Sequence, residues 1–377
     1  MNCMSNMDQT DWYLIDEVNQ LDSPALVFYQ ERMTANIEKL KQSIGDINRL
    51  RPHVKTHKTI EITQQLLAAG ITKFKCATIA EAEMLAISKA PDVLLAYQPT
   101  GPKIDRFIQL IKTYPETSFS CLIDNELSLK SIGRAALAAG VVVHLFMDLN
   151  VGMNRTGIHP EDKALELYEA AIAEKGVEIL GLHAYDGHIH DADYTIRENK
   201  AAGVLSSISK LTKRLVWKGM PEPVIIAGGT PTFPIYAKLE YIECSPGTFI
   251  LWDKGYQDAF QEQNYLTAAV VLTRVISLTD ATKITVDLGH KSVAAENVLK
   301  RRVCFLNAPT AEAVSQSEEH LVLELGPGHG FQIGDVLYGL PIHVCPTVAL
   351  YGNATIVTNH KITGGWKIVS RERKINI

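Results

Sequence analysis

The segment from residue 51 to residue 58 carries the side chains best suited to chemistry. It reads Arg51-Pro52-His53-Val54-Lys55-Thr56-His57-Lys58. Side chains alternate between the two faces of a strand, so the arginine, both histidines and Lys55 would share one face. Such groups are costly inside a core, which favours a place at the end of a strand. Cationic neighbours and partial burial lower the pKa of a lysine, and such a lysine suits imine formation with an aldehyde.

The same spacing also fits a basic edge strand at the surface, in which Lys55 is only solvated. Lys58 is the weaker candidate of the two lysines, because three residues along a strand turn it to the opposite face. The pattern alone therefore leaves a reactive lysine and a solvated one as alternatives.

Two glycine–threonine turns are candidates for holding a phosphate group. They are Ala227-Gly228-Gly229-Thr230-Pro231-Thr232 and Ser245-Pro246-Gly247-Thr248-Phe249. Backbone N–H groups of glycine-rich turns, assisted by a hydroxyl, bind phosphate, and barrel enzymes often bind it after their last strands. The alternative is that both are ordinary turns. The candidate residues are Gly229, Thr230, Gly247 and Thr248.

The elements that must position these residues alternate between short apolar runs and helical patterns. Strands are predicted at residues 25–29, 50–55, 74–78, 93–97, 118–123, 141–149, 178–185 and 224–227. Eight strands separated by helices predict parallel βαβ units and a (β/α)8 TIM-type barrel. The rival, a doubly wound open sheet, lacks its expected G-x-G-x-x-G after the first strand.

The C-terminal third has a different pattern, with strands and turns but little helix. This predicts an α/β chain of two domains, a barrel at residues 21–260 and a mostly antiparallel β domain at residues 261–377. Residues 1–20 are expected to pack with the β domain.

Composition excludes several classes of partner. The 377 residues carry a net charge of −5, with 46% hydrophobic and 21% charged residues, which is an ordinary globular balance and gives no reason to expect nucleic acid or an anionic membrane as a partner. There is no signal-peptide pattern and no run of 18 apolar residues. The six cysteines form no C-x-x-C pair and are read as reduced thiols, so we expect a cytoplasmic enzyme.

Two of these segments together resemble a known family. Leu21-Asp22-Ser23-Pro24-Ala25-Leu26-Val27 and the R-P-H-V-K-T-H-K string resemble the D-threonine aldolase and D-serine dehydratase family, which belongs to the alanine-racemase-like pyridoxal-phosphate enzymes. The resemblance runs from about residue 21 to residue 351. It implies a barrel followed by a β domain, a homodimer, pyridoxal 5'-phosphate as cofactor and Lys55 as the lysine that holds it.

The resemblance also implies contacts to the cofactor ring. Arg155, in a stretch resembling the family's D-x-G-x-x-R-x-G, would contact the ring oxygen or the substrate carboxylate, and a surface arginine is the alternative. His183 and Tyr185 share a strand face, and one of them would flank the ring. Val286–Lys291 and 317–320 resemble the family's D-x-G-x-K and E-E-H stretches.

A pair of side chains near the C-terminus suits a metal ion. His343 and Cys345 are two residues apart, so they would share a strand face, and imidazole with thiolate suits Zn²⁺. A buried thiol beside a histidine is the plainer alternative. Members of the family bind a divalent metal through a matching His-x-Cys or His-x-Asp pair, of which the first form resembles the dehydratase branch. Zn²⁺ is favoured, with Mn²⁺ or Mg²⁺ as alternatives.

The predicted function is that of a pyridoxal-phosphate-dependent lyase acting on a β-hydroxy D-amino acid, in the manner of a D-serine dehydratase. Lys55 is the expected base at Cα. The alternative is aldol cleavage to glycine and an aldehyde, with His57 or His188 as base. An amino-acid racemase would need a second acid/base and no metal, so the metal pair argues against it. A non-catalytic cofactor carrier would lack the β domain.

Overall fold

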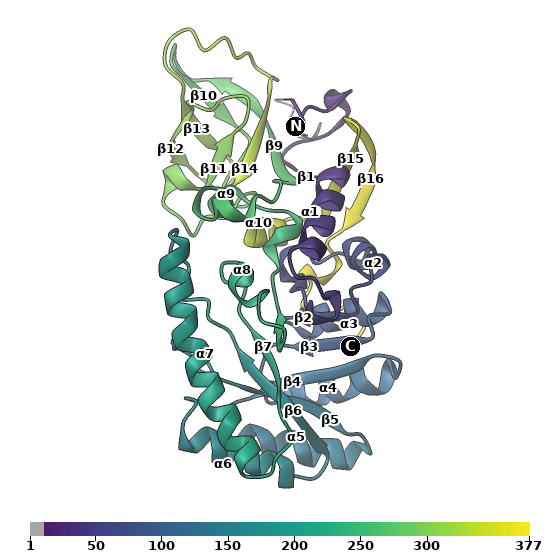
Figure 1. Cartoon of the computed structure of the whole chain (residues 1–377). Helices are drawn as coiled ribbons and strands as arrows, with labels where there is room; N and C mark the ends of the chain where they lie inside the picture. The colour runs from purple at the N-terminus through teal and green to yellow at the C-terminus, as the bar shows by residue number, and fades with distance from the viewer. Residues whose placement is uncertain (1–10) are drawn as a thin grey trace. The chain divides into compact units, whose positions relative to one another are not determined.

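The computed structural model describes residues 11–377, which form two compact units (Figure 1). The barrel unit comprises Leu40–Lys55, Ile60–Gly247 and Glu372–Ile377. The β unit comprises residues 11–39, Thr56–Thr59 and Thr248–Arg371.

The barrel unit is built on seven parallel strands, each paired with the next in chain order. They are β2 (Lys73–Cys76), β3 (Asp92–Leu95), β4 (Ser118–Ile123), β5 (Val143–Asp148), β6 (Val177–Ala184), β7 (Val224–Ala227) and β8 (Ile242–Cys244). Residues 50–53 close the ring, because Leu50 forms a parallel bridge to Cys244 and His53 one to Lys75. The predicted TIM-type barrel is therefore confirmed.

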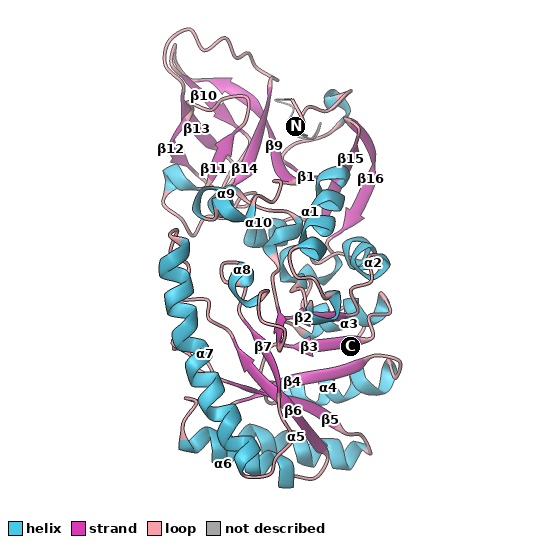
Figure 2. Ribbon diagram, in the orientation of Figure 1, coloured by secondary structure: helices cyan, strands magenta, loops and turns pink. Residues whose placement is uncertain are grey.

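Helices cover the outer face of this sheet (Figure 2). They are α2 (Ile60–Ala68), α3 (Ile79–Ile87), α4 (Pro102–Thr113), α5 (Glu126–Ala139), α6 (Asp162–Ala173), α7 (Tyr194–Trp217) and the short α8 (Phe233–Tyr236). Several begin at a side-chain cap, as where Thr78 accepts from Glu81 N and Asn125 from Ser128 N. Helices on the outside bury the strands on both faces, which fits their continuous apolar runs. No helix within residues 11–377 combines the length and the apolar character needed to cross a membrane.

The β unit contains a larger, mostly antiparallel sheet, as predicted. Its strands are β1 (Ala25–Tyr29), β9 (Ala269–Leu278), β10 (Lys283–Val286), β11 (Val303–Phe305), β12 (Glu312–Gln316), β13 (Leu321–Glu324), β14 (Val336–Pro341), β15 (Asn353–Thr358) and β16 (Lys361–Lys367). The unit also holds α9 (Lys254–Ala259) and α10 (Val344–Leu350), and α1 (Gln30–Gln42) follows β1 directly.

Part of the N-terminal segment packs into this sheet. Tyr13 and Ile15 lie in one apolar cluster with Val27 and Tyr29. Residues 1–10 lie outside the described part of the chain.

The strand count was right, but one strand was assigned to the wrong sheet. Residues 25–29 were expected to open the barrel, whereas β1 pairs antiparallel with β9 and parallel with β15 in the β unit. The eighth barrel position falls to β8, which the sequence pattern missed because it is only three residues long. A short apolar run reads alike in either kind of sheet, because its pairing partners lie far away in sequence.

The unit boundaries also differ from the predicted ones, because the local sequence does not show which unit a segment packs into. The β unit takes residues 11–39, and its main segment begins at Thr248 rather than at residue 261. The C-terminal residues 372–377 belong to the barrel unit, where Asn376 N and Ile377 N donate to Glu83 Oε2 at 3.1 and 3.2 Å.

Candidate active site

The segment from residue 51 to residue 58 is not one continuous strand. After His53 the chain enters a 3₁₀ turn at Val54–Thr56, and Lys58 has a φ of 56°. The predicted alternation therefore ends at His53. Arg51 is 2% exposed and bonds to Asp92 and Glu243 at 2.6 and 2.8 Å.

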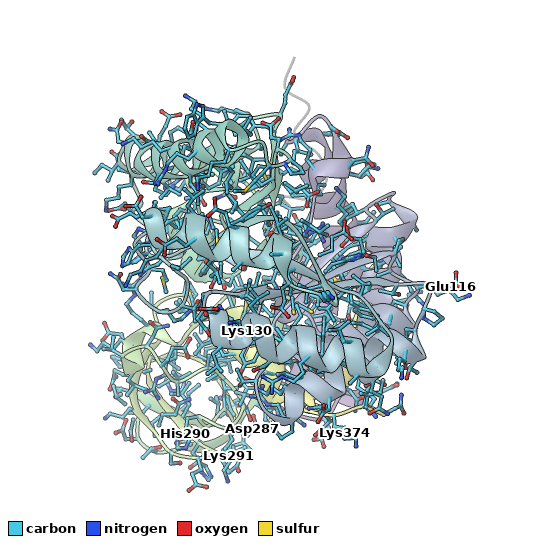
Figure 3. All side chains as sticks on the ribbon, turned by 90° about the horizontal axis from the view of Figure 1, so that it is seen from below. Glu116, Lys130, Asp287, His290, Lys291 and Lys374 are labelled. Carbon is cyan, nitrogen blue, oxygen red and sulfur yellow. The ribbon has the colours of Figure 1, made fainter. Side chains whose placement is uncertain are left out.

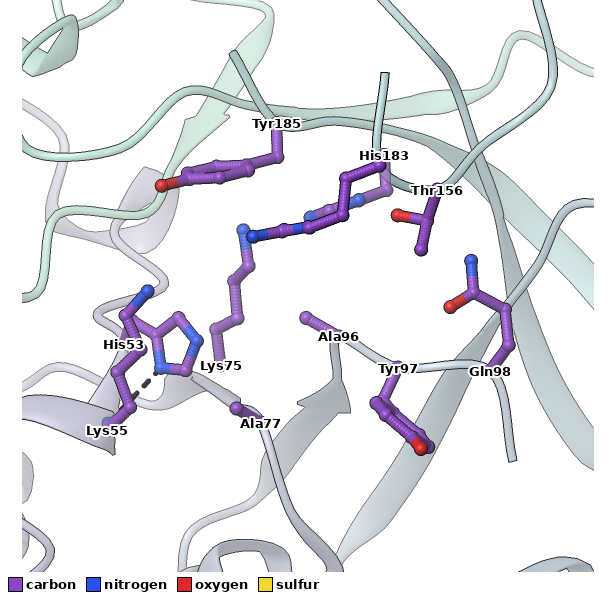
Figure 4. Close-up of a pocket in the computed structure, with 11 residues that line it drawn as sticks. His53, Lys55, Lys75, Ala77, Ala96, Tyr97, Gln98, Thr156, His183 and Tyr185 are labelled. Carbon is purple, nitrogen blue, oxygen red and sulfur yellow. Dashed lines mark hydrogen bonds between the residues drawn. The ribbon is translucent and has the colours of Figure 1, made fainter. Parts of the chain in front are cut away.

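His53 and Lys55 line a pocket of about 340 Å³ in the barrel unit (Figure 4). The pocket lies where the barrel strands end, the face on which barrel enzymes carry their active sites. The full lining is His53, Lys55, Lys75, Ala77, Ala96, Tyr97, Gln98, Arg155, Thr156, His183 and Tyr185. Four predicted site residues, Lys55, Arg155, His183 and Tyr185, are thus brought together.

The ring of Tyr185 is surrounded by cationic groups. Lys55 Nζ, Lys75 Nζ and Arg155 Cζ lie 5.7, 5.5 and 5.2 Å from the ring centroid. Figure 4 shows both lysines extending toward this ring. No aspartate or glutamate lines the pocket, so the cavity is electropositive.

His183 is held by a carboxylate behind it. Its Nδ1 lies 2.7 Å from Asp148 Oδ1, and Asp148 Oδ2 accepts from Gln98 Nε2 at 2.9 Å. Burial lowers the pKa of His183 to about 4, so the ring is neutral at pH 7. The neutral ring then donates from Nδ1 to Asp148, which leaves Nε2 as a buried acceptor with no hydrogen-bond partner among the described residues.

Lys75 was not predicted as a site residue. It stands near the end of β2, between the buried Phe74 and Cys76, and is itself only 3% exposed. Burial, and secondly the charge of Lys55, lower its pKa to about 7. A charged residue between two apolar residues near the C-terminal end of a barrel strand was the signal that could have revealed it.

The two predicted phosphate loops lie against each other. They follow β7 and β8, and Gly247 N donates to Thr230 Oγ1 at 3.1 Å. Gly228 needs its glycine, since its φ is 74° and a Cβ there would lie 2.5 Å from the Tyr236 side chain. A Cβ on Gly229 would come 3.1 Å from Tyr185, so the loop borders that ring. Thr248, the fourth predicted residue, belongs to the β unit.

These features fit pyridoxal phosphate. The pocket offers a lysine amine, an aromatic ring and an adjoining pair of glycine loops. Two buried polar atoms beside them, His183 Nε2 and Ser245 Oγ, have no protein partner in the described residues. Unsatisfied buried polar groups are rare, and a polar ligand is one way to satisfy them.

The two histidines predicted as bases are not among the residues that line this pocket. His57 belongs to the β unit, where Nδ1 lies 3.2 Å from Thr59 Oγ1 and burial lowers its pKa to about 3. His188 packs on Gly152, where a Cβ would lie 2.6 Å from its ring.

His343 and Cys345 do not share a strand face. His343 precedes α10 and Cys345 lies in its first turn, so the predicted strand at this position was wrong. Burial by itself lowers the pKa of His343. The hydrogen bond to Cys345 and the negative charge of that thiolate raise it, as do the charge of Asp253 and the hydrogen bond to Glu296, so that the pKa is about 9. Cys345 Sγ lies 3.2 Å from Thr56 Oγ1 and 3.9 Å from Thr248 Oγ1, all within the β unit.

The donor set suits a metal with open coordination positions. His343 Nδ1 lies 2.6 Å from Glu296 Oε1, and a carboxylate on one ring nitrogen is the usual way to orient a histidine that binds a metal through the other. Within residues 11–377 no group of three or more His, Cys, Asp or Glu side chains could hold a metal. The pair would therefore supply two ligands and leave the rest to water or substrate.

The D-x-G-x-K and E-E-H stretches meet at the surface of the β unit. Lys291, labelled in Figure 3, pairs with Glu318 and Glu319 at 2.6 and 3.1 Å. The Lys291 side chain is 55% exposed, so this contact is an exterior ion pair.

Comparison with known proteins agrees with the fold. A family model described as "Alanine racemase, N-terminal domain" matches residues 29–254, and one described as "Putative serine dehydratase domain" matches residues 268–357. A D-threonine aldolase from Arthrobacter sp. is 27% identical over 369 residues, 94% of each chain. A D-threo-3-hydroxyaspartate dehydratase from Delftia sp. is 24% identical over 363 residues, 89% of this chain and 94% of that one.

Solved structures show the same fold. A D-threonine aldolase from Filomicrobium marinum superposes with a TM-score of 0.86 at 24% identity, covering 95% of this chain and 98% of that one. The Delftia dehydratase has been solved as a cysteine-to-alanine variant in a metal-free form, with a TM-score of 0.83, 22% identity and coverage of 93% and 98%. The predicted kinship to these lyases is confirmed, and the chain belongs to the alanine racemase N-terminal domain family, in which it carries a C-terminal serine dehydratase-type domain.

Proposed function

We propose that this chain is a pyridoxal-phosphate-dependent lyase acting on a β-hydroxy D-amino acid, and more narrowly that it is a dehydratase of the D-serine type. The observation that carries the proposal is the place of Lys55, in a cavity it shares with Tyr185 and Arg155 where the barrel strands end. The family supports the cofactor, and the relatives named as aldolases and dehydratases support the reaction class.

The residues that would hold the cofactor follow from the pocket. Lys55 would attach it, Tyr185 would flank its ring, and the loops with Gly229, Thr230 and Gly247 would take its phosphate together with Thr248. When bound, pyridoxal phosphate supplies an electron sink that stabilises negative charge at Cα of an amino acid.

The side chains of the chain itself position the substrate and move protons. Arg155 presents a planar fork that suits the substrate carboxylate. Lys55 would be the base for the α-proton. His183 Nε2, fixed by Asp148, offers a buried acceptor for a substrate or cofactor hydroxyl.

We further propose that His343 and Cys345 bind a divalent metal, with Zn²⁺ favoured by the thiolate and Mn²⁺ or Mg²⁺ as alternatives. Such an ion acts as a Lewis acid, which would help the β-hydroxyl leave. Thr56, whose hydroxyl lies 3.2 Å from Cys345 Sγ, follows Lys55 directly in the sequence.

Aldol cleavage is the second candidate, and one observation favours it: the Arthrobacter relative is named as a D-threonine aldolase. The match to a putative serine dehydratase domain and the cysteine in the metal pair favour dehydration. Racemisation is the third candidate, and it would leave the β-hydroxyl in place.

Product identification tests the proposal. Dehydration converts D-serine to pyruvate and ammonia, and D-threonine to 2-oxobutanoate and ammonia. Aldol cleavage converts D-threonine to glycine and acetaldehyde. We expect a 2-oxo acid from the enzyme loaded with cofactor and metal. Glycine with acetaldehyde would favour the second candidate, and the L-amino acid without any carbonyl product would contradict both lyase reactions.

A further inference from the structure

Lys75 is a buried, ionisable side chain to which the proposed reaction assigns no role. It lines the pocket and is 3% exposed, yet among residues 11–377 no hydrogen bond or ion pair involves its Nζ. A buried ammonium without a hydrogen-bonding or ion-pair partner is destabilising, and an anionic ligand is one way to compensate its charge.

The nearest carboxylates are already engaged. Asp148 accepts from Gln98 Nε2 and pairs with His183, while Asp186 accepts from Thr232 Oγ1 at 3.0 Å and from Tyr236 OH at 2.7 Å. Neither carboxylate lines the pocket. Neither carboxylate forms a hydrogen bond or ion pair with Lys75, so inside the pocket a ligand is the remaining source of such an anion.

The remaining charges of the site can be assigned without Lys75. The loops proposed for the phosphate offer backbone N–H groups and threonine hydroxyls of their own, and none of their residues is among those that line this pocket. The α-carboxylate of an amino acid suits the fork of Arg155. Lys55 would hold the cofactor. The Lys75 amine, 5.5 Å from the centroid of the Tyr185 ring, then has no assigned role.

We propose that Lys75 binds a second negative group on the substrate, so that the pocket selects D-amino acids whose side chain carries a carboxylate. This inference rests on the proposed function, and it narrows the substrate from β-hydroxy D-amino acids in general to 3-hydroxy-D-aspartate-type compounds. Lys75 is then a specificity-determining residue rather than a base.

A matched pair of ligands isolates this charge. D-Aspartate and D-asparagine have nearly the same shape, differ by one negative charge, and lack the β-hydroxyl that either lyase reaction requires. Their binding to the cofactor-loaded protein can be followed by the change in cofactor absorbance. We expect wild type to bind D-aspartate at least about 10-fold more tightly, the effect of one charge-assisted hydrogen bond.

Three variants complete the test. Lys75→Met should weaken the binding of D-aspartate alone, which brings the two dissociation constants to within about threefold of each other. Lys75→Arg should keep the preference for D-aspartate. Lys112→Met, which removes an exposed charge at the end of α4, should behave as wild type. The proposal is overturned if wild type shows no preference, if Lys75→Met keeps it, or if that variant weakens both ligands equally, as a structural or cofactor-binding role would.

Turnover separates this inference from the proposed function. If none of D-serine, D-threonine and 3-hydroxy-D-aspartate gives a carbonyl product, the lyase proposal fails, whereas the ligand preference is measured without any reaction. In an active enzyme, Lys75→Met should lower kcat/KM for 3-hydroxy-D-aspartate at least about 10-fold and leave that for D-serine within about threefold. Equal loss of kcat for both substrates would mean that Lys75 transfers a proton and would contradict the inference.

Discussion

Burial sets the ionisation of Lys75, and this has a measurable effect on stability. Its pKa of about 7 lies below the 10.5 of an unfolded lysine. Between these values the unfolded chain holds a proton that the folded chain has lost, so the free energy of unfolding rises with pH across that range and the penalty is full below pH 7. Lys75→Met should therefore stabilise the cofactor-free protein by roughly 3–5 kcal/mol at pH 6.5 and by much less near pH 10.

Denaturant unfolding of wild type and Lys75→Met at both pH values measures this difference. A gap between the two proteins that does not change with pH would show that the ammonium is not desolvated in the folded state.

The metal pair makes a separate prediction. Removing the ion with a chelator, or a ligand by Cys345→Ala, should lower lyase activity at least about 10-fold while leaving the cofactor absorbance in place. Cys304→Ala is the matched control, because Cys304 is a partly buried free thiol on β11 of the same unit. Activity that survives both the chelator and Cys345→Ala would remove the metal from the mechanism.

Sequence patterns found the residues whose neighbours in the chain mark them. Lys55, Arg155, His183 and Tyr185 stand in distinctive stretches, and the structure brings them to one pocket. Lys75 went unnoticed because a lysine on a strand usually reaches solvent. Only the closed barrel shields its amine from water, and barrel closure cannot be inferred from the local sequence. The proposed roles of His57 and His188 rested on sequence proximity, which does not determine which cavity a side chain faces.

At the scale of elements, the strands were recognised better than their pairing. Alternating apolar runs indicated eight parallel strands, but β1 and β8 show that neither sheet membership nor a three-residue strand can be inferred from local pattern. The 3₁₀ turn at Val54–Thr56 was missed for a related reason. Tertiary contacts of the chain there override the strand preference of valine and threonine.

The loop after β7 allows a test at this scale. Gly228→Ala would place a Cβ 2.5 Å from the Tyr236 side chain at a φ of 74°, so the loop has to shift. We expect cofactor affinity to fall about 10-fold or more, a cost of roughly 1–3 kcal/mol.

Gly203→Ala is the matched control, since Gly203 lies within α7 and has open space around it. That substitution should raise stability by about 0.5–1 kcal/mol and leave cofactor affinity unchanged. Equal cofactor affinity in both variants, measured by titration of absorbance, would show that the β7 loop does not bind the phosphate.

For the molecule as a whole, the family resemblance leads us to propose a homodimer. Light scattering on the purified protein should give twice the mass of the chain at micromolar concentration, and a single-chain mass would contradict the proposal.

The central claim is that Lys55 holds the cofactor, and the pocket contains a second lysine that makes the claim sharply testable. The protein loaded with pyridoxal phosphate should absorb at about 420 nm, and the Lys55→Ala variant should lack that absorbance band. Reduction with borohydride followed by peptide mass mapping should find the pyridoxyl group on Lys55. Finding it on Lys75, or finding no modified lysine in wild type, would contradict the account.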